Sequence, residues 1–262
     1  MKGPLDLERQ FALLLTASVR VNPGLAGVTA AGAAEREAEY AETLGYLVRE
    51  HPRVRKIVFA ENSGWPAARF EDAVAANPWG KEVEILQLRC NDFPGSLGKG
   101  YGEALLLDRA LAASRLAGTV RHVAKLTGRQ RVLNMTRLLE RVPRDFELLC
   151  DLRDHRLYEL LRLPGAGNYC DTRFFVFTLP FFDAHLRRLH EAPVRGELNL
   201  EAAYYRAVKA LERQPGVICR FPIEPRYRGR AGHWHKDYGS PVSRAKQSLR
   251  AAARRLLPRL RL

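Results

Sequence analysis

The sequence predicts an α/β fold with a mainly parallel central sheet. In the first 155 residues, short apolar runs of strand length alternate with longer amphipathic stretches of helical period. The connections between them are short, which is typical of parallel strands joined by helices that cover both faces of a sheet. After residue 155 the order changes to strand, helix, helix, strand. We therefore expect the second part of the chain to extend the same sheet rather than to form an independent domain.

The first part is expected to hold five strands and the helices between them. The strands are predicted at residues 11–19, 54–60, 83–88, 120–126 and 146–152, and the helices at 33–50, 66–76, 102–117 and 130–141. Pro66 can open the second helix because proline is tolerated in a first helical turn.

The second part is expected to add fewer elements. A helix is predicted at residues 156–163, a turn at 164–167, a strand at 169–178, helices at 180–190 and 198–214, and a last strand at 217–223. The strand at 169–178 is apolar except where Asp171 and Arg173 interrupt it. We divide the chain into residues 1–155, residues 156–240 and a tail of residues 241–262.

Composition narrows the class of protein. Hydrophobic residues make up 46% of the chain and no low-complexity tract is visible, which argues against disorder. The four cysteines are far apart, without a C-x-x-C pair, and this favours buried thiols in a reducing cytoplasm over zinc or a redox dithiol. No run approaches the roughly 18–20 apolar residues of a membrane span, and the first residues do not have the pattern of a signal peptide. We expect a cytoplasmic protein.

The formal net charge of +14 calls for an anionic partner. From Tyr238 onward there is no acidic residue, and arginines and one lysine recur among leucines. Such a basic amphipathic helix is typical of an interfacial anchor on an anionic leaflet, and we assign residues 244–262 to this role. The alternative is a solvated helix that packs its leucines on the body of the protein.

Residues 98–103, Gly-Lys-Gly-Tyr-Gly-Glu, form a glycine-lysine segment directly before the third predicted helix. Glycines let a backbone approach a ligand closely, and the free N–H groups of a helix start favour an anion. The P-loop pattern fails, because Phe93 stands where its first glycine belongs and Gly100 where Ser or Thr should follow the lysine. The G-x-G-x-x-G pattern fails because the glycines are spaced by two and two. The alternative is a flexible turn capping an ordinary helix.

A second cluster, Lys125-Leu126-Thr127-Gly128-Arg129, comes at the end of the fourth predicted strand. In open α/β sheets, ligands bind outside the carboxyl ends of the strands. Both segments therefore predict a site for a phosphate-bearing ligand at this edge of the sheet.

Over residues 11–240 the chain resembles bacterial glycosyltransferases of capsule and lipopolysaccharide assembly, which have the GT-A type of Rossmann-like fold. The resemblance depends on the order of five motifs: Leu14-Leu15-Thr16-Ala17, Glu61-Asn62-Ser63-Gly64, the glycine-lysine segment, Lys125-Leu126-Thr127-Gly128-Arg129 and Cys170-Asp171-Thr172-Arg173-Phe174-Phe175. It implies a donor half in residues 1–155, which binds a nucleotide-sugar, and an acceptor half in residues 156–240. The acceptor implied is a lipid-linked or growing glycan, at the inner face of the cytoplasmic membrane.

The resemblance also implies which residues hold the donor. These are Thr16, Glu61, Asn62, Ser63, Gly98, Lys99, Gly100, Lys125, Thr127, Gly128, Arg129, His233 and His235. Glu61 can accept hydrogen bonds from ribose or base, and the cations can offset a diphosphate, Arg129 through a bidentate fork. Each has an ordinary alternative: a cap and turn before the Pro66 helix for Glu61, surface charge for the lysines and arginine, and surface residues for the two histidines.

Relatives of this type usually carry an Asp-x-Asp metal motif where this chain has Lys125-Leu126-Thr127. Cations can replace the metal there, so a divalent metal is disfavoured and no cofactor is assigned beyond the nucleotide-sugar. The fallback metal ligands are Asp151 and Asp154.

Inverting transfer needs a general base within hydrogen-bond reach of the acceptor hydroxyl. In related folds this carboxylate begins the helix on the acceptor side, which makes Glu201 the first choice, Glu197 the second and Asp171 the third. The alternative for Glu201 is an ordinary first-turn carboxylate favoured by the helix dipole.

Two other classes compete with this interpretation. A basic nucleic-acid-binding protein would use the +14 charge, but no RRM, KH, OB or helix-turn-helix signature is present, so no nucleic-acid partner is expected. Another Rossmann-like nucleotide-dependent transferase would be expected to carry a glycine-rich loop after the first strand, and residues 18–24 contain none.

Overall fold

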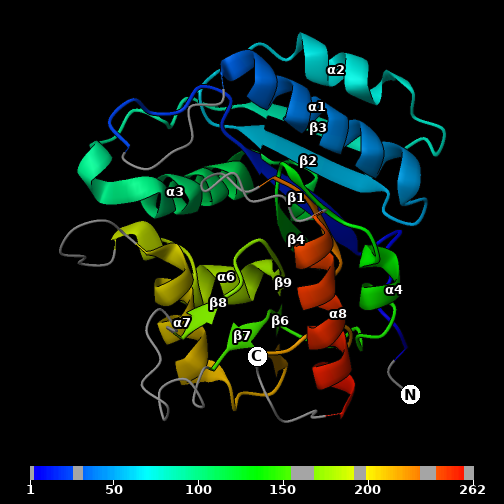
Figure 1. The fold of residues 1–262 in the computed structure, drawn as a ribbon. Coiled ribbons are helices and arrows are strands. Elements are labelled where there is room, and N and C mark those ends of the chain that lie inside the picture. Colours follow the sequence, from blue (N-terminus) through cyan, green and yellow to red (C-terminus); the bar gives the residue numbers. More distant parts are fainter. Residues whose placement is uncertain (1–2, 26–31, 155–167, 192–198, 231–239, 257–262) are drawn as a thin grey trace.

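The computed structural model describes residues 3–25, 32–154, 168–191, 199–230 and 240–256. These residues form a Rossmann-like α/β fold around a seven-stranded, mainly parallel sheet (Figure 1). In sheet order the strands are β10 (Val217–Ile218), β6 (Leu148–Leu149), β9 (Phe174–Thr178), β4 (His122–Thr127), β1 (Phe11–Ala17), β2 (Lys56–Glu61) and β3 (Glu82–Gln87). Within this sheet, only β9 runs antiparallel to its neighbours. The predicted fold class is confirmed.

Helices cover both faces of this sheet. They are α1 (Ala33–Glu50), α2 (Ala68–Ala75), α3 (Gly98–Ala113), α4 (Met135–Leu139), α6 (Leu179–His185), α7 (Leu200–Leu211) and α8 (Pro241–Leu256). In Figure 1, α3 and α7 lie to the left of the sheet, and α1 and α2 lie at the top right. No helix among the described residues has both the length and the apolar character to cross a membrane.

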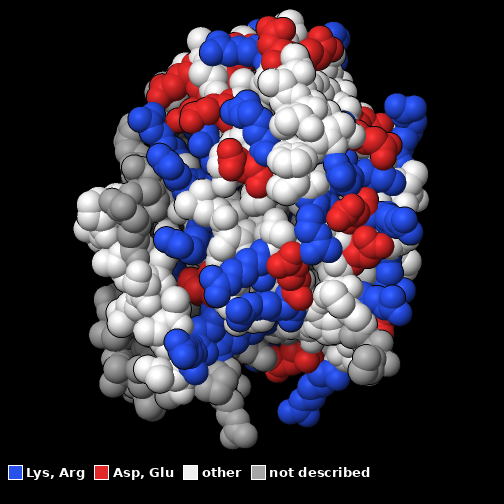
Figure 2. Space-filling view, turned by 90° about the vertical axis from the view of Figure 1, so that its right-hand side faces the viewer, with Lys and Arg blue, Asp and Glu red and all other residues white. Residues whose placement is uncertain are grey.

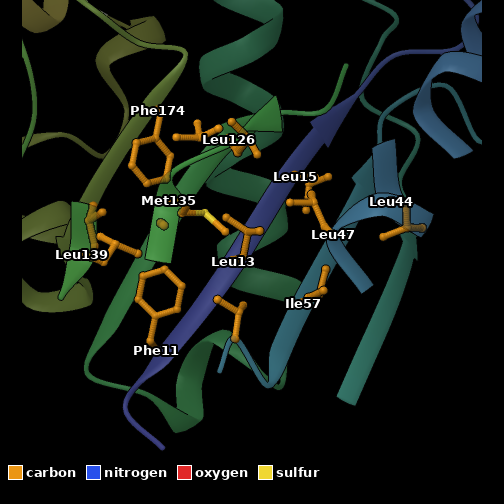
Figure 3. Packing of buried hydrophobic residues seen from close by; sticks show 14 of the residues in the cluster. Phe11, Leu13, Leu15, Leu44, Leu47, Ile57, Leu126, Met135, Leu139 and Phe174 are labelled. Atoms are coloured by element: carbon orange, nitrogen blue, oxygen red, sulfur yellow. The ribbon is translucent and has the colours of Figure 1, made fainter. Parts of the chain in front are cut away.

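The alternation of side chains along β1 explains the two-sided packing. All seven residues of β1 are buried, because successive side chains point to opposite faces and each face has its own core. Leu13 and Leu15 pack with Leu44 and Leu47 of α1, and Met135 of α4 joins this cluster (Figure 3). The second core lies on the other face, where residues of α3, α6 and α7 meet the alternate residues of β1 and β4.

The helix α1 has the predicted bounds, whereas several other elements differ. The third helix begins at Gly98 rather than Gly102, so the glycine-lysine segment is its first turn and not a loop before it. The predicted helix at 130–141 was wrong in its first part, because β5 (Gln130–Val132) pairs with β11 (Tyr227–Gly229), a strand that the sequence analysis missed.

Two predicted strands are divided. Residues 146–152 give β6 and then β7 (Leu152–Arg153), and residues 169–178 give β8 (Tyr169–Cys170) and then β9. β7 and β8 pair with each other outside the main sheet. Asp171 lies at the break between β8 and β9, where its carboxylate accepts a hydrogen bond from the backbone N–H of Arg173. The predicted helix at 156–163 lies outside the described residues.

Candidate functional site

The sheet order places a pocket at its topological switch point. β1 has β2 on one side and β4 on the other, and the helices that follow β1 and β3 lie on opposite faces. At such a point the connections diverge, and a crevice opens outside the carboxyl ends of the two central strands. A pocket enclosing about 820 Å³ of space, part of it open to solvent, lies there.

The pocket wall is built from seven parts of the chain. Residues of the β1 end, α1, the β2 end, the segment before α3, α3 itself and the β4 end all line it, and Arg230, just beyond β11, completes it. Of the residues predicted to hold a donor, the lining includes Thr16, Asn62, Lys99, Thr127 and Arg129. The pocket thus joins parts of four of the five sequence motifs.

Positive charge predominates in this wall. The cations that line the pocket are Arg36, Lys99, Arg129 and Arg230, against one carboxylate, Glu103. Guanidinium forks match the oxygens of phosphate groups, so the excess of cations suits a phosphate-bearing ligand.

Tertiary contacts hold the arginines in place. Arg36 donates from Nε and Nη2 to the backbone oxygen of Ser18, at 2.8 and 2.6 Å. Arg129 Nη1 lies 2.8 Å from a carboxylate oxygen of Glu39, and Arg230 contacts the same carboxylate at 3.4 Å. Glu39 thereby holds two guanidinium groups from distant parts of the chain at one edge of the pocket.

The pocket lining also offers polar and aromatic groups. Asn62 is buried, and its Oδ1 has no hydrogen-bond partner among the described residues. Its Nδ2 lies 3.5 Å from Oδ1 of Asn91, and the rings of Phe93 and Tyr40 also line the pocket. A buried acceptor beside aromatic rings can receive a polar ring system such as a nucleobase.

Glu61 is engaged by the protein itself. Its carboxylate is completely buried and accepts hydrogen bonds from the backbone N–H groups of Val19 (3.0 Å), Ser63 (2.9 Å) and Trp65 (2.9 Å), and from the Ser63 hydroxyl (2.6 Å). These bonds fix the turns after β1 and β2. Glu61 and Ser63 are outside the pocket lining, where they support its wall; direct contact with a ribose stays a prediction.

Lys125 is also occupied internally. Its buried ammonium donates to the carboxylate of Glu103, to the Thr127 hydroxyl at 3.0 Å and to the Thr172 backbone oxygen at 2.7 Å. Three acceptors match the three N–H donors of an ammonium group. The groups that reach the pocket from this cluster are therefore Thr127 and Glu103, and Glu103 was quoted in a sequence motif but not assigned to the site.

The glycines of the two motifs allow close packing. A Cβ on Gly102 would lie 2.5 Å from the ring of Phe93, and one on Gly128 would lie 2.6 Å from the backbone oxygen of Thr16. Gly98 has φ of 78°, which favours glycine, and both Gly98 and Gly100 are buried in the first turn of α3. Glycine here brings the pocket wall together, and Lys99 of the same turn lines the pocket.

Glu201 lies in the first turn of α7, where Asn199 caps the helix by accepting a hydrogen bond from the backbone N–H of Ala202 at 3.0 Å. Burial raises the pKa of the Glu201 carboxyl, and the negative charge of Glu103 adds to the rise, against the opposing effects of a backbone hydrogen bond, Lys99 and Lys125. Glu201 is outside the pocket lining, but its charge interacts with those of Glu103 and Lys99, which line it. A carboxyl with a raised pKa suits proton transfer near neutral pH.

Asp171 and Asp151 belong to a separate buried network, and Asp154 has different partners. Burial alone would raise the pKa of Asp171, but Arg173 and Arg153 outweigh it and hold the pKa at about 2. Asp151 pairs with Arg153 at 2.9 Å and with Arg254 at 3.0 Å. The carboxylate of Asp154 accepts hydrogen bonds from the Tyr205 hydroxyl and, at 3.0 Å, from Lys209.

Among the described residues, no group of three or more His, Cys, Asp or Glu side chains is arranged to hold a metal ion. Both fallback ligands, Asp151 and Asp154, are engaged by cations. The predicted residues Glu197, His233 and His235 lie outside the described residues.

Comparison with known proteins gives remote likenesses only. The sequence matches no protein-family model and no curated protein. HddC from Yersinia pseudotuberculosis is 13% identical, with a TM-score of 0.42 over 91% of this chain and 98% of that chain. The inositol-1-phosphate CTP transferase from T. maritima is 13% identical, with a TM-score of 0.42 over 80% and 84%.

A third solved structure, a CMP:2-keto-3-deoxy-manno-octonic acid synthetase complexed with CTP, is 12% identical, with a TM-score of 0.41 over 93% of this chain and 99% of that chain. Likenesses of this size say nothing about what this chain does.

Proposed function

We propose that this chain is a nucleotide-dependent transferase that moves a sugar from a nucleotide-sugar donor to a glycan acceptor. The observation that carries the proposal is the cationic pocket at the switch point between β1 and β4, which has four basic side chains in its lining against one carboxylate. A nucleotide-sugar presents a diphosphate to such cations and a base to the polar and aromatic wall.

The lining supports a division of roles. Arg36, Lys99 and Arg129 would offset the diphosphate charge, and Asn62 with Phe93 would receive the nucleoside. Because Lys125 is engaged by Glu103, Thr127 and Thr172, its role is to position Glu103 rather than to bind the diphosphate. The four cations of the pocket would do the work of a metal ion, and transfer would be metal-independent.

Glu201 is the proposed general base. Its raised pKa supports the role of a base, and its charge interacts with those of Glu103 and Lys99 in the pocket lining. In an inverting transfer, it would take the proton of the acceptor hydroxyl as the oxygen attacks the sugar carbon and the nucleoside diphosphate leaves.

The acceptor is proposed to be a lipid-linked or growing cell-surface glycan, as in capsule or lipopolysaccharide assembly, reached from the cytoplasmic side of the membrane. This part of the proposal is supported by the order of the sequence motifs alone.

Another nucleotide-dependent transferase on this fold would use the same pocket, and it is the alternative. The two differ in the bond that breaks. Glycosyl transfer releases a nucleoside diphosphate from a nucleoside-diphosphate sugar, or CMP from a CMP-sugar, whereas nucleotidyl transfer from a nucleoside triphosphate to a sugar phosphate releases pyrophosphate.

The test has a binding stage and a turnover stage. UDP, GDP, CMP, dTDP and CTP are screened by thermal shift with and without Mg²⁺. A nucleotide that binds, at a concentration of about 100 times its Kd, should raise the Tm by roughly 5–10 °C. Stabilisation by one nucleoside diphosphate without metal, followed by its release from the matching nucleotide-sugar, supports the proposal. Pyrophosphate release from CTP and a sugar phosphate would establish the alternative.

A matched pair of variants links binding to the pocket. Lys99→Met removes an exposed lining cation, and Arg115→Met removes a cation whose side chain is 91% exposed and outside the lining. Loss of the thermal shift in Arg115→Met but not in Lys99→Met would place the nucleotide elsewhere.

A nucleic-acid-binding protein would need basic residues along one continuous face. On the face shown in Figure 2, Lys and Arg gather in the lower middle of the view, but Asp and Glu are mixed with them toward the top. Tight, salt-sensitive binding of DNA or RNA together with no response to any nucleotide would overturn the transferase proposal.

A further inference from the structure

The C-terminal helix α8 is attached to the body by one face. Arg254 donates from both Nη atoms to the Asp151 carboxylate, at 3.0 to 3.1 Å, and from Nε to Glu224 at 2.9 Å. Seven residues earlier, on the same side of the helix, Gln247 donates to the Tyr227 backbone oxygen at 3.4 Å. α8 is therefore a docked helix with a fixed orientation, not a free tail.

The opposite face of α8 is apolar and exposed. Val242, Leu249 and Leu256, which we call the apolar stripe, are 65%, 73% and 75% exposed. They are spaced by seven residues, so they lie in one row along the helix, and Leu249 is about 140° around the helix from Arg254. Ala245 and Ala252 are exposed between them.

This exposure is concentrated in α8. Five large hydrophobic side chains are exposed among the described residues, and three of them form the apolar stripe. The other two lie singly in connecting segments, Trp79 between α2 and β3 and Leu133 between β5 and α4. Scattered exposed apolar residues are ordinary, whereas a continuous row marks an interaction surface.

Charge indicates which partner fits. α8 contains Arg244, Lys246, Arg250, Arg254 and Arg255 and no acidic residue. Arg254 is engaged by the body, but Lys246 and Arg255 are exposed. A second copy of the helix would bring like charges together, whereas an anionic surface would pair with them.

We propose that α8 docks this protein on an anionic lipid bilayer, with the apolar stripe at the boundary between headgroups and acyl chains and the basic side chains against lipid phosphates. The docked orientation favours this geometry, because Arg254 turns the polar face of the helix toward the protein and leaves the apolar stripe outward. The surface acts independently of the nucleotide pocket, so this inference does not require the proposed function to hold.

Co-sedimentation with vesicles tests the proposal. The full chain is mixed with vesicles of phosphatidylcholine alone or with phosphatidylglycerol added. Binding should require the anionic lipid and weaken in high salt. Lys246→Gln with Arg255→Gln should weaken binding roughly 30-fold, from about 1 kcal/mol per basic residue.

A second pair of variants tests the apolar stripe. Leu249→Glu with Leu256→Glu should abolish vesicle binding, and Leu133→Glu, at an exposed apolar residue outside α8, should leave it unchanged. Because the substituted side chains are exposed, both variants should have the same Tm and the same thermal shift with nucleotide as the wild-type protein. Vesicle binding that survives the α8 substitutions would overturn the proposal.

Light scattering after size-exclusion chromatography tests the competing possibility, that the apolar stripe binds a second copy of this chain. The wild-type chain should be monomeric at the concentrations used for vesicles. A dimer that Leu249→Glu with Leu256→Glu dissociates, in a chain that ignores anionic vesicles, would show instead that the apolar stripe binds a second copy.

Discussion

Two regions of this molecule combine arginines and carboxylates near strand ends. They differ in the ratio of positive to negative charge and in how accessible those charges are to a ligand. In the pocket, four cations face an open space with one carboxylate in the lining. Beneath α8, Arg153, Arg173 and Arg254 meet Asp151, Asp171 and Glu224. There the charges neutralise one another and the carboxylates are buried.

The comparison shows that the type of residue at a strand end does not identify a site. Asp171 was the third choice of base and Asp151 a fallback metal ligand, and opposite charges already satisfy both. Charge at the surface of a pocket that a ligand can reach is the better criterion. The two regions should therefore respond differently to substitution: the pocket in binding and rate, the network in stability.

The largest expected effect is on turnover. Glu201→Gln keeps the shape of the side chain but removes the base, so the single-turnover rate of transfer should fall about 10²- to 10⁴-fold. Nucleotide affinity, measured by calorimetry, should stay within about twofold. If affinity falls as far as the rate, Glu201 belongs to the donor site and is not the base.

The next effect is on stability. Arg254→Met removes one partner of a buried ion-pair network and leaves Asp151 and Glu224 with Arg153 alone, which should lower the free energy of unfolding by about 3–5 kcal/mol. Urea denaturation measures this loss. Nucleotide affinity of the folded fraction should not change; a selective loss of affinity would mean that the two regions are coupled.

A smaller effect is expected from the pocket cations. Lys99→Met removes an exposed charge from the lining, so the Kd for the nucleoside diphosphate should rise about tenfold while the Tm of the free protein stays the same. The salt dependence of binding should also become less steep. A fall in Tm without a change in Kd would assign Lys99 to the structure rather than to the site.

The smallest effect is a shift in a pH profile. Burial and Glu103 raise the pKa of Glu201, and a base acts only when deprotonated, so the rate should rise with pH through a midpoint above that of an ordinary glutamate. Glu103→Gln removes a negative charge and should move the midpoint to lower pH. Lys99→Met removes a cation that lowers this pKa and should move it to higher pH. Equal profiles in all three proteins would exclude Glu201 as the titrating group.

Local patterns predicted the elements that depend on local sequence. The amphipathic period of α1 gave its bounds, and the runs in β1 to β4 lie within a few residues of the strands. β5 was missed because residues 130–132 form a strand only by pairing with Tyr227–Gly229, far along the chain. The start of α3 was placed late because glycine disfavours helices, whereas here Gly102 makes room for the ring of Phe93.

For the site, too, the sequence predicted only the residues that belong to local motifs. Thr16, Asn62, Lys99, Thr127 and Arg129 come from motifs at strand or helix ends, and they line the pocket. Arg36 was missed because nothing distinguishes it from other charged residues of an amphipathic helix. Arg230 was not assigned because its contact with Glu39 joins distant segments. Similarly, no local signal shows that the Lys125 ammonium donates its hydrogen bonds to Glu103, Thr127 and Thr172.

The place of β9 in the sheet has a consequence for how the protein is made. β9 lies between β4 and β6, although β6 precedes it in the chain. During translation, β1 to β4 can pair as soon as they leave the ribosome, but β6 has no edge to join until Phe174–Thr178 has emerged. A ribosome stalled between these strands would display a folded parallel core with β6 still unpaired, and the sheet would close only when synthesis resumed.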